Sequence, residues 1–285
     1  MNDKNLHINN KLSQNDLENF LAKVEVPHTQ SKEEIWERLS QKLEETSSRK
    51  SRLIHPRRWM AAAAALIILI GLAAVLRFQA TTLQTSSGQH LVCELPDGSK
   101  VRLNAESTIT YHPWWWRISR EIKFEGEAFF EVQKGSPFRV ISEAGKTVVL
   151  GTSFNIFARS GNYEVVCVTG KVRVVSPDNK EAILIPDYTA KIQANGQILV
   201  KKLNAKDDQT DWIHNKFSFT SVPLTSVFQE VERQYNVTIQ TGISQELIYT
   251  GHFQGQREVG EVLELLCKPF GLQFEKISEK VYRVY

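Results

Sequence analysis

The sequence predicts a mainly β protein with α+β parts, attached to one membrane-spanning helix. Three observations lead to this fold class: an uninterrupted apolar segment at 59–76, short alternating strands over 85–202, and a duplicated helix–strand pattern over 212–285. The chain has 285 residues, of which 35 are Lys or Arg and 32 are Asp or Glu. This balance excludes a strongly basic protein, so charge alone gives no indication of direct nucleic-acid binding.

The apolar segment from Trp59 to Leu76 contains no charged residue. As a helix it would extend roughly 27 Å, close to the thickness of a bilayer core. Several cations precede it at 49–58, whereas Arg77 stands alone on the other side until Lys100. Positive flanks stay inside, so we expect a single-pass protein with its N-terminus in the cytoplasm. A buried helix of a soluble protein is the alternative, and it would need protein on every side.

Residues 1–58 are predicted to form a cytoplasmic arm with two short amphipathic helices. The first helix should end at Pro27, and the second should begin at Ser31, where Glu34 completes a capping-box pattern. Two helices of this length are marginal alone, so their apolar faces predict a groove on a partner protein. A hairpin packed on itself is the alternative. The predicted contact residues are Leu17, Phe20, Leu21, Ile35, Trp36 and Leu39.

The region 85–202 is predicted to be a β-sandwich or a jelly-roll-like barrel. Its first hairpin turns at Pro96–Gly98, with Leu91 and Cys93 before the turn and Val101 and Leu103 after it. More short strands follow at small intervals. Among them, Ile122–Phe124 and Ala128–Val132 are expected as two separate strands.

The region 212–285 contains a duplication. An apolar helical face at Leu224, Val227, Phe228, Val231 and Tyr235 is repeated 35 residues later at Val259, Val262, Leu263, Leu266 and Phe270. An aromatic strand residue precedes each helix, and an extended pair follows it. We therefore predict two successive β-α-β units with the helices on one face of a sheet, leaving a sheet edge or face available for pairing.

The chain lacks the motifs of common catalytic and metal sites. It has no G-x-S-x-G, H-E-x-x-H, C-x-x-C or P-loop pattern, and its seven histidines have no ligand spacing. The three cysteines are expected to be buried free thiols, with a Cys93–Cys167 disulfide as the alternative. Glu125 and Glu127 are expected to be solvated. We predict neither an enzyme nor a cofactor.

The three consecutive tryptophans at 114–116 allow two interpretations. They are expected to form a loop packed on the sandwich, and a platform for stacking sugars is the alternative.

Several motifs resemble the FecR family of sigma-factor regulators. The resemblance begins at Leu95–Ser99 and Gly126–Val132, and continues through Pro137–Val140, Leu150–Asn155 and Val168–Val172. In addition, Phe219–Val237 resembles the STN-like C-terminal domain that is fused to FecR proteins in Bacteroidetes. Together these segments cover roughly 85–285, in the order that the family shows.

The resemblance implies a transmembrane anti-sigma factor in the inner membrane, with its C-terminus in the periplasm. Its partners would be a cytoplasmic extracytoplasmic-function sigma factor and the signalling domain of an outer-membrane TonB-dependent transducer, often SusC-like. The arm at 1–58 is shorter than the familiar anti-sigma domain, so an inhibiting and an activating role both stay open. A membrane-anchored periplasmic glycan-binding protein or envelope structural protein is the alternative function.

Some FecR-family members cleave themselves at a Gly-Thr bond that matches Gly151-Thr152. The resemblance therefore implies that the Thr152 hydroxyl can attack the Gly151 carbonyl and form an ester that water breaks. The alternative is structural: Gly151 ends one strand and Thr152 begins the next.

Overall fold

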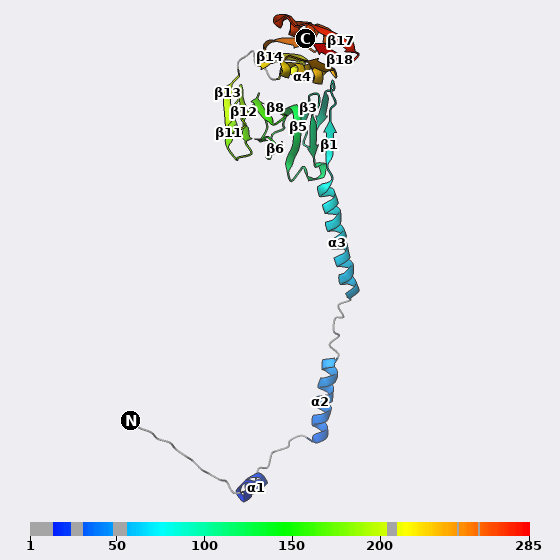
Figure 1. Ribbon diagram of the computed structural model, residues 1–285. Helices are drawn as coiled ribbons and strands as arrows, with labels where there is room; N and C mark the ends of the chain where they lie inside the picture. Colours follow the sequence, from blue (N-terminus) through cyan, green and yellow to red (C-terminus); the bar gives the residue numbers. More distant parts are fainter. Residues whose placement is uncertain (1–13, 24–30, 48–55, 204–209, 244, 256) are drawn as a thin grey trace, which may run out of the picture. The chain divides into compact units, whose positions relative to one another are not determined.

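The computed structural model describes residues 14–23, 31–47, 56–203, 210–243, 245–255 and 257–285 (Figure 1). The chain divides into two units, Met1–Leu66 and Ile67–Tyr285, with the boundary inside an apolar helix. Each unit is described by itself.

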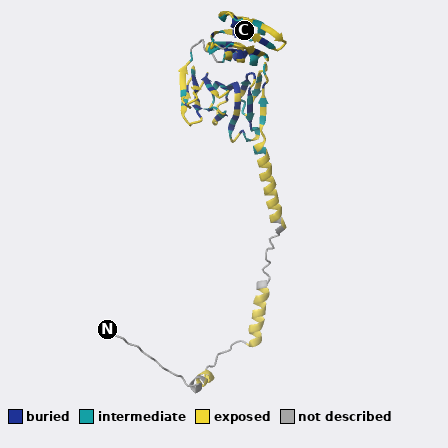
Figure 2. Ribbon diagram, viewed as in Figure 1, coloured by how far each residue is buried: buried dark blue, intermediate teal, exposed yellow. Residues whose placement is uncertain are grey.

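The first unit contains the two helices expected of the arm, α1 (Gln14–Lys23) and α2 (Lys32–Ser47). The predicted capping box is present, because Glu34 N donates to Ser31 Oγ at 3.2 Å while Ser31 N donates to Glu34 Oε2 at 3.3 Å. Pro27, the predicted end of the first helix, lies outside the described residues. The described side chains of both helices are exposed (Figure 2).

Helix α3 (Pro56–Phe78) contains the predicted apolar segment and extends it by a few residues at each end. Its part from Trp59 to Phe78 is long and apolar enough to cross a membrane, and it is the one such helix in the described part of the chain. None of that part is buried inside the protein. The structure therefore does not support the alternative of a core helix surrounded by protein.

The second unit begins inside α3, at Ile67, and continues into a lobe of thirteen strands, here called the β lobe. Its strands are β1 (Thr81–Gln84), β2 (Leu91–Glu94), β3 (Lys100–Leu103), β4 (Thr108–Tyr111), β5 (Arg120–Glu131), β6 (Phe138–Ile141), β7 (Lys146–Val149), β8 (Ser153–Arg159), β9 (Asn162–Cys167), β10 (Val172–Val175), β11 (Glu181–Leu184), β12 (Tyr188–Ile192) and β13 (Ile198–Lys202). Two sheets share β5. The first sheet has the order β1-β4-β5-β6-β7-β10-β11, and the second has the order β2-β3-β5-β8-β9-β12-β13.

The shared strand β5 corrects the prediction of two strands, because one strand of 12 residues runs through both expected segments. Its first half pairs with β4 and β6, and its second half pairs with β3 and β8. The change of partners falls at Gly126, which has a φ of +115°. A Cβ atom at Gly126 would overlap Ser107, so both the backbone angle and the space require glycine.

The core of the β lobe lies between the two sheets. Phe130 and Phe154 stack at its centre, with ring centroids 5.0 Å apart. The predicted first hairpin is confirmed, since Leu91 lies opposite Leu103 and Cys93 lies opposite Val101. Inward-facing side chains from both sheets thus form one cluster.

The tryptophan run forms a loop with a short 3₁₀ helix, η1 (Pro113–Trp115). Trp116 is buried, and its ring meets those of Tyr111 and Phe138 edge to face. Trp114 is 64% exposed, so the predicted packing of this loop on the sandwich holds for Trp116 and not for Trp114.

The C-terminal lobe has the expected repeat of strand, helix and strand. Its elements are η2 (Asp211–His214), β14 (Lys216–Pro223), α4 (Leu224–Tyr235), β15 (Thr238–Thr241), β16 (Ile248–Gln254), α5 (Val259–Cys267), η3 (Lys268–Phe270), β17 (Phe274–Ser278) and β18 (Val281–Val284). The central positions of both predicted helical faces are buried. The prediction of one sheet is wrong, because β14 pairs with β16 while β15, β18 and β17 form a second sheet.

Candidate functional site

The C-terminal lobe packs against the outer face of the second sheet of the β lobe. Phe129, which points outward from β5, contacts the hydrophobic core of the C-terminal lobe. Trp212 Nε1 donates to Asn155 Oδ1 at 3.2 Å, and the Trp212 ring meets that of His90 edge to face. These contacts define an interface between the two lobes, which we call the lobe interface.

A buried carboxylate lies at the centre of the lobe interface. Glu127, on β5, accepts hydrogen bonds from two amides: Asn104 Nδ2 at 2.8 Å and Asn155 Nδ2 at 3.0 Å. From α4, Gln234 Nε2 donates to Asn104 Oδ1 and to Glu230 Oε1, both at 2.8 Å. The network thus links strands of the β lobe to a helix of the C-terminal lobe.

The surroundings of Glu127 favour its neutral form. Burial raises its pKa to about 7, and the nearby charge of Glu230 adds to the effect. The hydrogen bonds from Asn155 and Asn104 and the charge of Arg159 act in the opposite direction, but they do not outweigh burial. Glu230 itself forms an ion pair with Arg233 at 2.7 Å.

The prediction that Glu125 and Glu127 are both solvated is therefore wrong for Glu127. Glu125 is exposed, whereas Glu127 is buried together with its amide partners. This difference arises from the tertiary structure, because the C-terminal lobe covers the outer face of the second sheet. A signal was present in the sequence, since Phe129 is a large apolar residue on the same outward-facing side of the strand.

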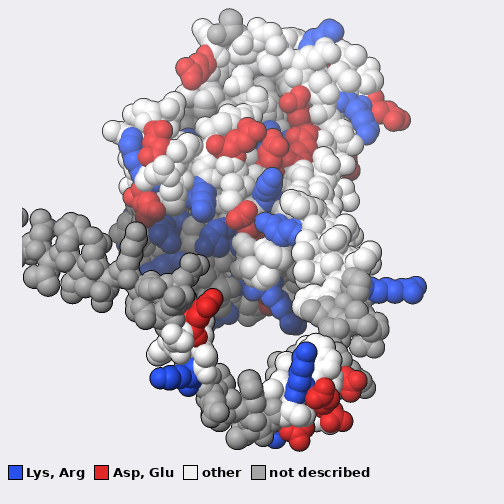
Figure 3. Space-filling model, turned by 90° about the horizontal axis from the view of Figure 1, so that it is seen from below, with Lys and Arg blue, Asp and Glu red and all other residues white. Residues whose placement is uncertain are grey.

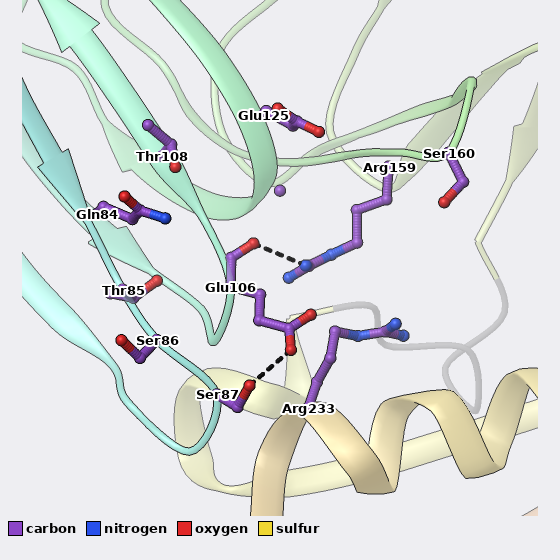
Figure 4. A pocket seen from close by; sticks show the side chains of 11 residues that line it. Gln84, Thr85, Ser86, Ser87, Glu106, Thr108, Glu125, Arg159, Ser160 and Arg233 are labelled. Carbon is purple, nitrogen blue, oxygen red and sulfur yellow. Dashed lines mark hydrogen bonds between the residues drawn. The ribbon is translucent and has the colours of Figure 1, made fainter. Parts of the chain in front are cut away.

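A pocket of about 540 Å³ opens beside the lobe interface (Figure 4). Arg159, on β8, points into it and donates to the Glu106 carbonyl at 2.8 Å. Ser87 Oγ donates to Glu106 Oε1 at 2.6 Å, and Arg233 reaches the pocket from α4. Both guanidinium groups are already paired within the protein, and none of the lining residues is aromatic. The pocket therefore lacks the stacking platform typical of a glycan site.

The predicted partner-binding residues of the arm are placed on two helices. Leu17, Phe20 and Leu21 lie on α1, and Ile35, Trp36 and Leu39 lie on α2. Exposed fractions are 67% for Phe20 and 73% for Trp36. The side chain of Leu17 is outside the described part, and the other five are exposed. The apolar faces thus have no cover from the described residues, and the alternative of a self-packed hairpin is not observed there.

Gly151 and Thr152 lie in the connection between β7 and β8. Gly151 has a φ of +152°, and a Cβ atom there would overlap Lys134. Thr152 is buried, and its Oγ1 donates to the Lys171 carbonyl at 3.1 Å. This geometry gives Gly151 a structural reason to be glycine. The geometry does not test the self-cleavage reaction, which stays a prediction.

The three cysteines are free thiols, as predicted, and the alternative Cys93–Cys167 disulfide is not formed; Cys167 and Cys267 are buried as expected, whereas Cys93 is only partly buried. Burial raises the pKa of the Cys167 and Cys267 thiols to about 11, with the charge of Asp187 contributing at Cys167. Thiols of this kind are largely protonated at neutral pH and react slowly.

In the described part of the chain, charged residues and metal ligands add no further site. Lys and Arg side chains and Asp and Glu side chains both occur on the face that Figure 3 shows, and neither sign covers it alone. Among the described residues, no group of His, Cys, Asp and Glu side chains could hold a metal ion. Fold and interface together define a class of protein: two packed β-rich lobes attached to an apolar helix.

Comparison with known protein families agrees with this class. The FecR protein family matches residues 81–173, and the FecR C-terminal family matches residues 216–284. The chain belongs to the FecR family. The predicted membership of the FecR family is thus confirmed, and it supports a regulatory role in signalling.

Two solved structures from Parabacteroides distasonis ATCC 8503, each assigned as an anti-sigma factor, share the fold. The first has a TM-score of 0.66 and 29% identity, and the match covers 73% of this chain and 99% of that chain. The second has a TM-score of 0.65 and 30% identity, with coverages of 72% and 98%. Among the curated proteins, none matches this chain.

Proposed function

We propose that this protein is a single-pass anti-sigma factor of the inner membrane. It relays a signal from an outer-membrane TonB-dependent transducer of the SusC-like type to a cytoplasmic extracytoplasmic-function sigma factor. One observation carries the proposal: FecR-family lobes follow directly on an apolar helix whose other end carries helices with uncovered apolar faces. The cations at 49–58 support a cytoplasmic arm and periplasmic lobes.

The arm is the part that would bind the sigma factor. Trp36 and Leu39 on α2, with Phe20 and Leu21 on α1, expose apolar surface that is costly to leave in water. An amphipathic helix lying in an apolar groove removes such surface from water. Among the described residues, the lobes have two α-helices, α4 and α5. Neither offers a comparable exposed apolar face, because their central apolar positions are buried.

The C-terminal lobe, STN-like in the proposed assignment, would receive the transducer. The sheet β15-β18-β17 has two edges, and four of the five residues of β17 are exposed. An extended strand of a partner can add to such an edge through backbone hydrogen bonds.

The hydrogen-bond pattern of β17 shows which backbone groups face outward. Gln273 and Tyr285 exchange hydrogen bonds, at 2.9 and 3.0 Å. Pairs alternate along an antiparallel ladder, so the pair of Lys276 and Tyr282 is one that does not exchange hydrogen bonds. The N–H of Lys276 therefore points away from β18 toward the free edge.

A substitution at this position tests the proposal. Lys276→Pro removes one outward-facing donor without removing a donor of the β17–β18 ladder. In cells that carry a sigma-dependent reporter, we expect it to reduce the response to the inducing ligand. The matched control Lys276→Ala keeps the N–H and should respond normally.

Deleting residues 212–285 should abolish the response while leaving membrane insertion intact. A reporter that responds normally after the deletion would place the docking site in the β lobe. A sigma factor that does not co-purify with the full-length chain would contradict the proposed function itself.

A further inference from the structure

The tryptophan loop lies at the end of the apolar helix. Helix α3 ends at Phe78, and β1 begins at Thr81. Strand β1 pairs antiparallel with β4, and Thr81 lies opposite Tyr111. The residues that follow Tyr111 are therefore brought back to the point where the chain leaves α3.

Side-chain contacts fix the loop in this place. The guanidinium of Arg77 lies 4.8 Å from the ring centroid of Trp115, a cation–π distance. His112 Nδ1 is 3.2 Å from the Gln79 carbonyl oxygen. On the other side, buried Trp116 attaches the loop to the core. The loop at 112–119, here called the aromatic loop, is thus held between the helix end and the sandwich.

The exposed side chains of the aromatic loop and of the adjoining helix end are apolar or basic. Trp114 is 64% exposed, Ile118 is 68% exposed, and Phe78 at the helix end is 76% exposed. Arg117 is also exposed. Large apolar side chains next to cations, at the end of an apolar helix, match the composition of a membrane–water boundary.

We propose that the aromatic loop binds the surface of the bilayer that α3 crosses. Trp114 and Ile118 enter the interfacial layer, while Arg77 and Arg117 face the lipid phosphates. The proposal rests on the proposed membrane span. Lipid is the proposed partner because the aromatic loop lies at the end of the helix that enters the bilayer. The exposed side chains of the loop are therefore at the depth of the lipid headgroups.

The loop's geometry favours lipid over the alternative of a sugar platform. Trp116 is buried and the Trp115 ring is in contact with Arg77, which leaves Trp114 as the one largely exposed indole of the three. A single ring beside an isoleucine and an arginine provides interfacial anchoring, for which no flat stacking surface is needed.

Spin labels on the full-length chain in lipid nanodiscs test the proposal. The three native cysteines are replaced by alanine, and Ile118→Cys carries a nitroxide. We expect this label to be relaxed strongly by oxygen, which concentrates in lipid, and weakly by a water-soluble nickel chelate. Ile248→Cys is the matched control: an isoleucine that is 49% exposed on β16 of the C-terminal lobe, where the nickel chelate should dominate.

A third label separates this proposal from the one on which it rests. Ile70→Cys, in the middle of α3, reports whether the helix is in lipid. A lipid-like signal at 70 with a water-like signal at 118 would overturn the aromatic-loop proposal and leave the span intact. Water-like signals at both positions would overturn both.

Discussion

Gln234 of α4 donates through Nε2 to Oδ1 of Asn104 in the β lobe, 2.8 Å away, although the two residues are 130 positions apart in the sequence. The same nitrogen donates to Glu230, and Asn104 in turn donates to Glu127. Removing one of these side chains takes a hydrogen bond from each of its neighbours, and the neighbours Asn104 and Glu127 are buried. The lobe interface is therefore sensitive to changes at a few positions.

The first prediction concerns the pH dependence of the lobe interface. Glu127 has a pKa of about 7 in the packed protein, above its ordinary value of 4.5. Below pH 4.5 it is neutral whether packed or exposed, so its contribution to stability is then fully present. Stability should fall as pH rises from about 4.5 through 7, by about 1–3 kcal/mol, because ionisation then favours the exposed state.

Thermal unfolding of the full-length chain between pH 5 and 8 checks this prediction, with Glu127→Gln as the variant. Glutamine does not titrate, so this part of the pH slope should vanish. The slope is the readout, because the new amide nitrogen faces an amide donor and lowers stability at every pH. An unchanged slope in Glu127→Gln would show that another group is responsible.

A second prediction concerns the ion pair of Arg120 with Asp97, two side chains that are 7% and 17% exposed. Burial alone would raise the pKa of Asp97, but hydrogen bonds from Ser99 and the charge of Arg120 lower it. A lowered pKa contributes stability above about pH 4, and this stability is lost as pH falls through the folded-state value. Arg120→Met should cost about 3–5 kcal/mol, because it leaves a largely buried carboxylate without its cation.

Urea unfolding at pH 7 measures this loss. The control is Arg173→Met on β10, whose partner Glu181 is 3.7 Å away and about half exposed. Breaking this surface pair should cost less than about 1 kcal/mol. Equal losses in the two variants would contradict the structural role of Arg120.

The third prediction concerns the arm. Trp36→Ala should weaken binding of the full-length chain to its sigma factor by about tenfold or more. An indole that becomes buried on binding often contributes much of the binding free energy of a small interface. Calorimetry with the purified sigma factor measures the affinity. Gln41→Ala, at an exposed polar position of α2, should leave it unchanged. Unchanged affinity in both Trp36→Ala and Leu39→Ala would show that the apolar face of the arm does not contact the sigma factor.

The fourth prediction concerns the bond between Gly151 and Thr152. Self-cleavage would join the Thr152 oxygen to the Gly151 carbonyl carbon, break the C–N bond and leave the proton on the freed amine, before water hydrolyses the ester. In the structure that hydroxyl donates to the Lys171 carbonyl, which cannot accept a proton as a base would. We therefore expect the purified chain to remain one band on a denaturing gel. Two bands in the wild type, absent in Thr152→Ala, would establish cleavage.

Local patterns were sufficient to predict the elements that depend on their own periodicity. The repeated apolar faces gave α4 and α5, because positions such as Val227 and Val262 recur at helical spacing and are fully buried. The first hairpin followed from alternation around a turn that contains Gly98, which has a φ of +79°.

Features that depend on distant parts of the chain were missed. The two strands expected at Ile122–Phe124 and Ala128–Val132 are one, because Gly126 lets a single strand change partners beside Ser107. Glu127 was expected to be solvated together with Glu125 on the same strand, but the C-terminal lobe, which begins more than eighty residues later in the sequence, covers it. The C-terminal lobe shows the same limit: the pattern gave its strands, and pairing over long distances decided that they form two sheets.

Gln79 and Ala80 are the two residues that separate α3 from β1. Two residues have about four soft backbone dihedrals, and hydrogen bonds hold part of this connection: Gln79 N donates to the Val75 carbonyl at 3.0 Å, and the Gln79 carbonyl oxygen lies 3.2 Å from His112 Nδ1. The first strand of the β lobe is moreover held by its pairing with β4. Because the connection is short and held on both sides, we expect a rotation of the β lobe to be passed on to the end of α3 and not to be absorbed between them.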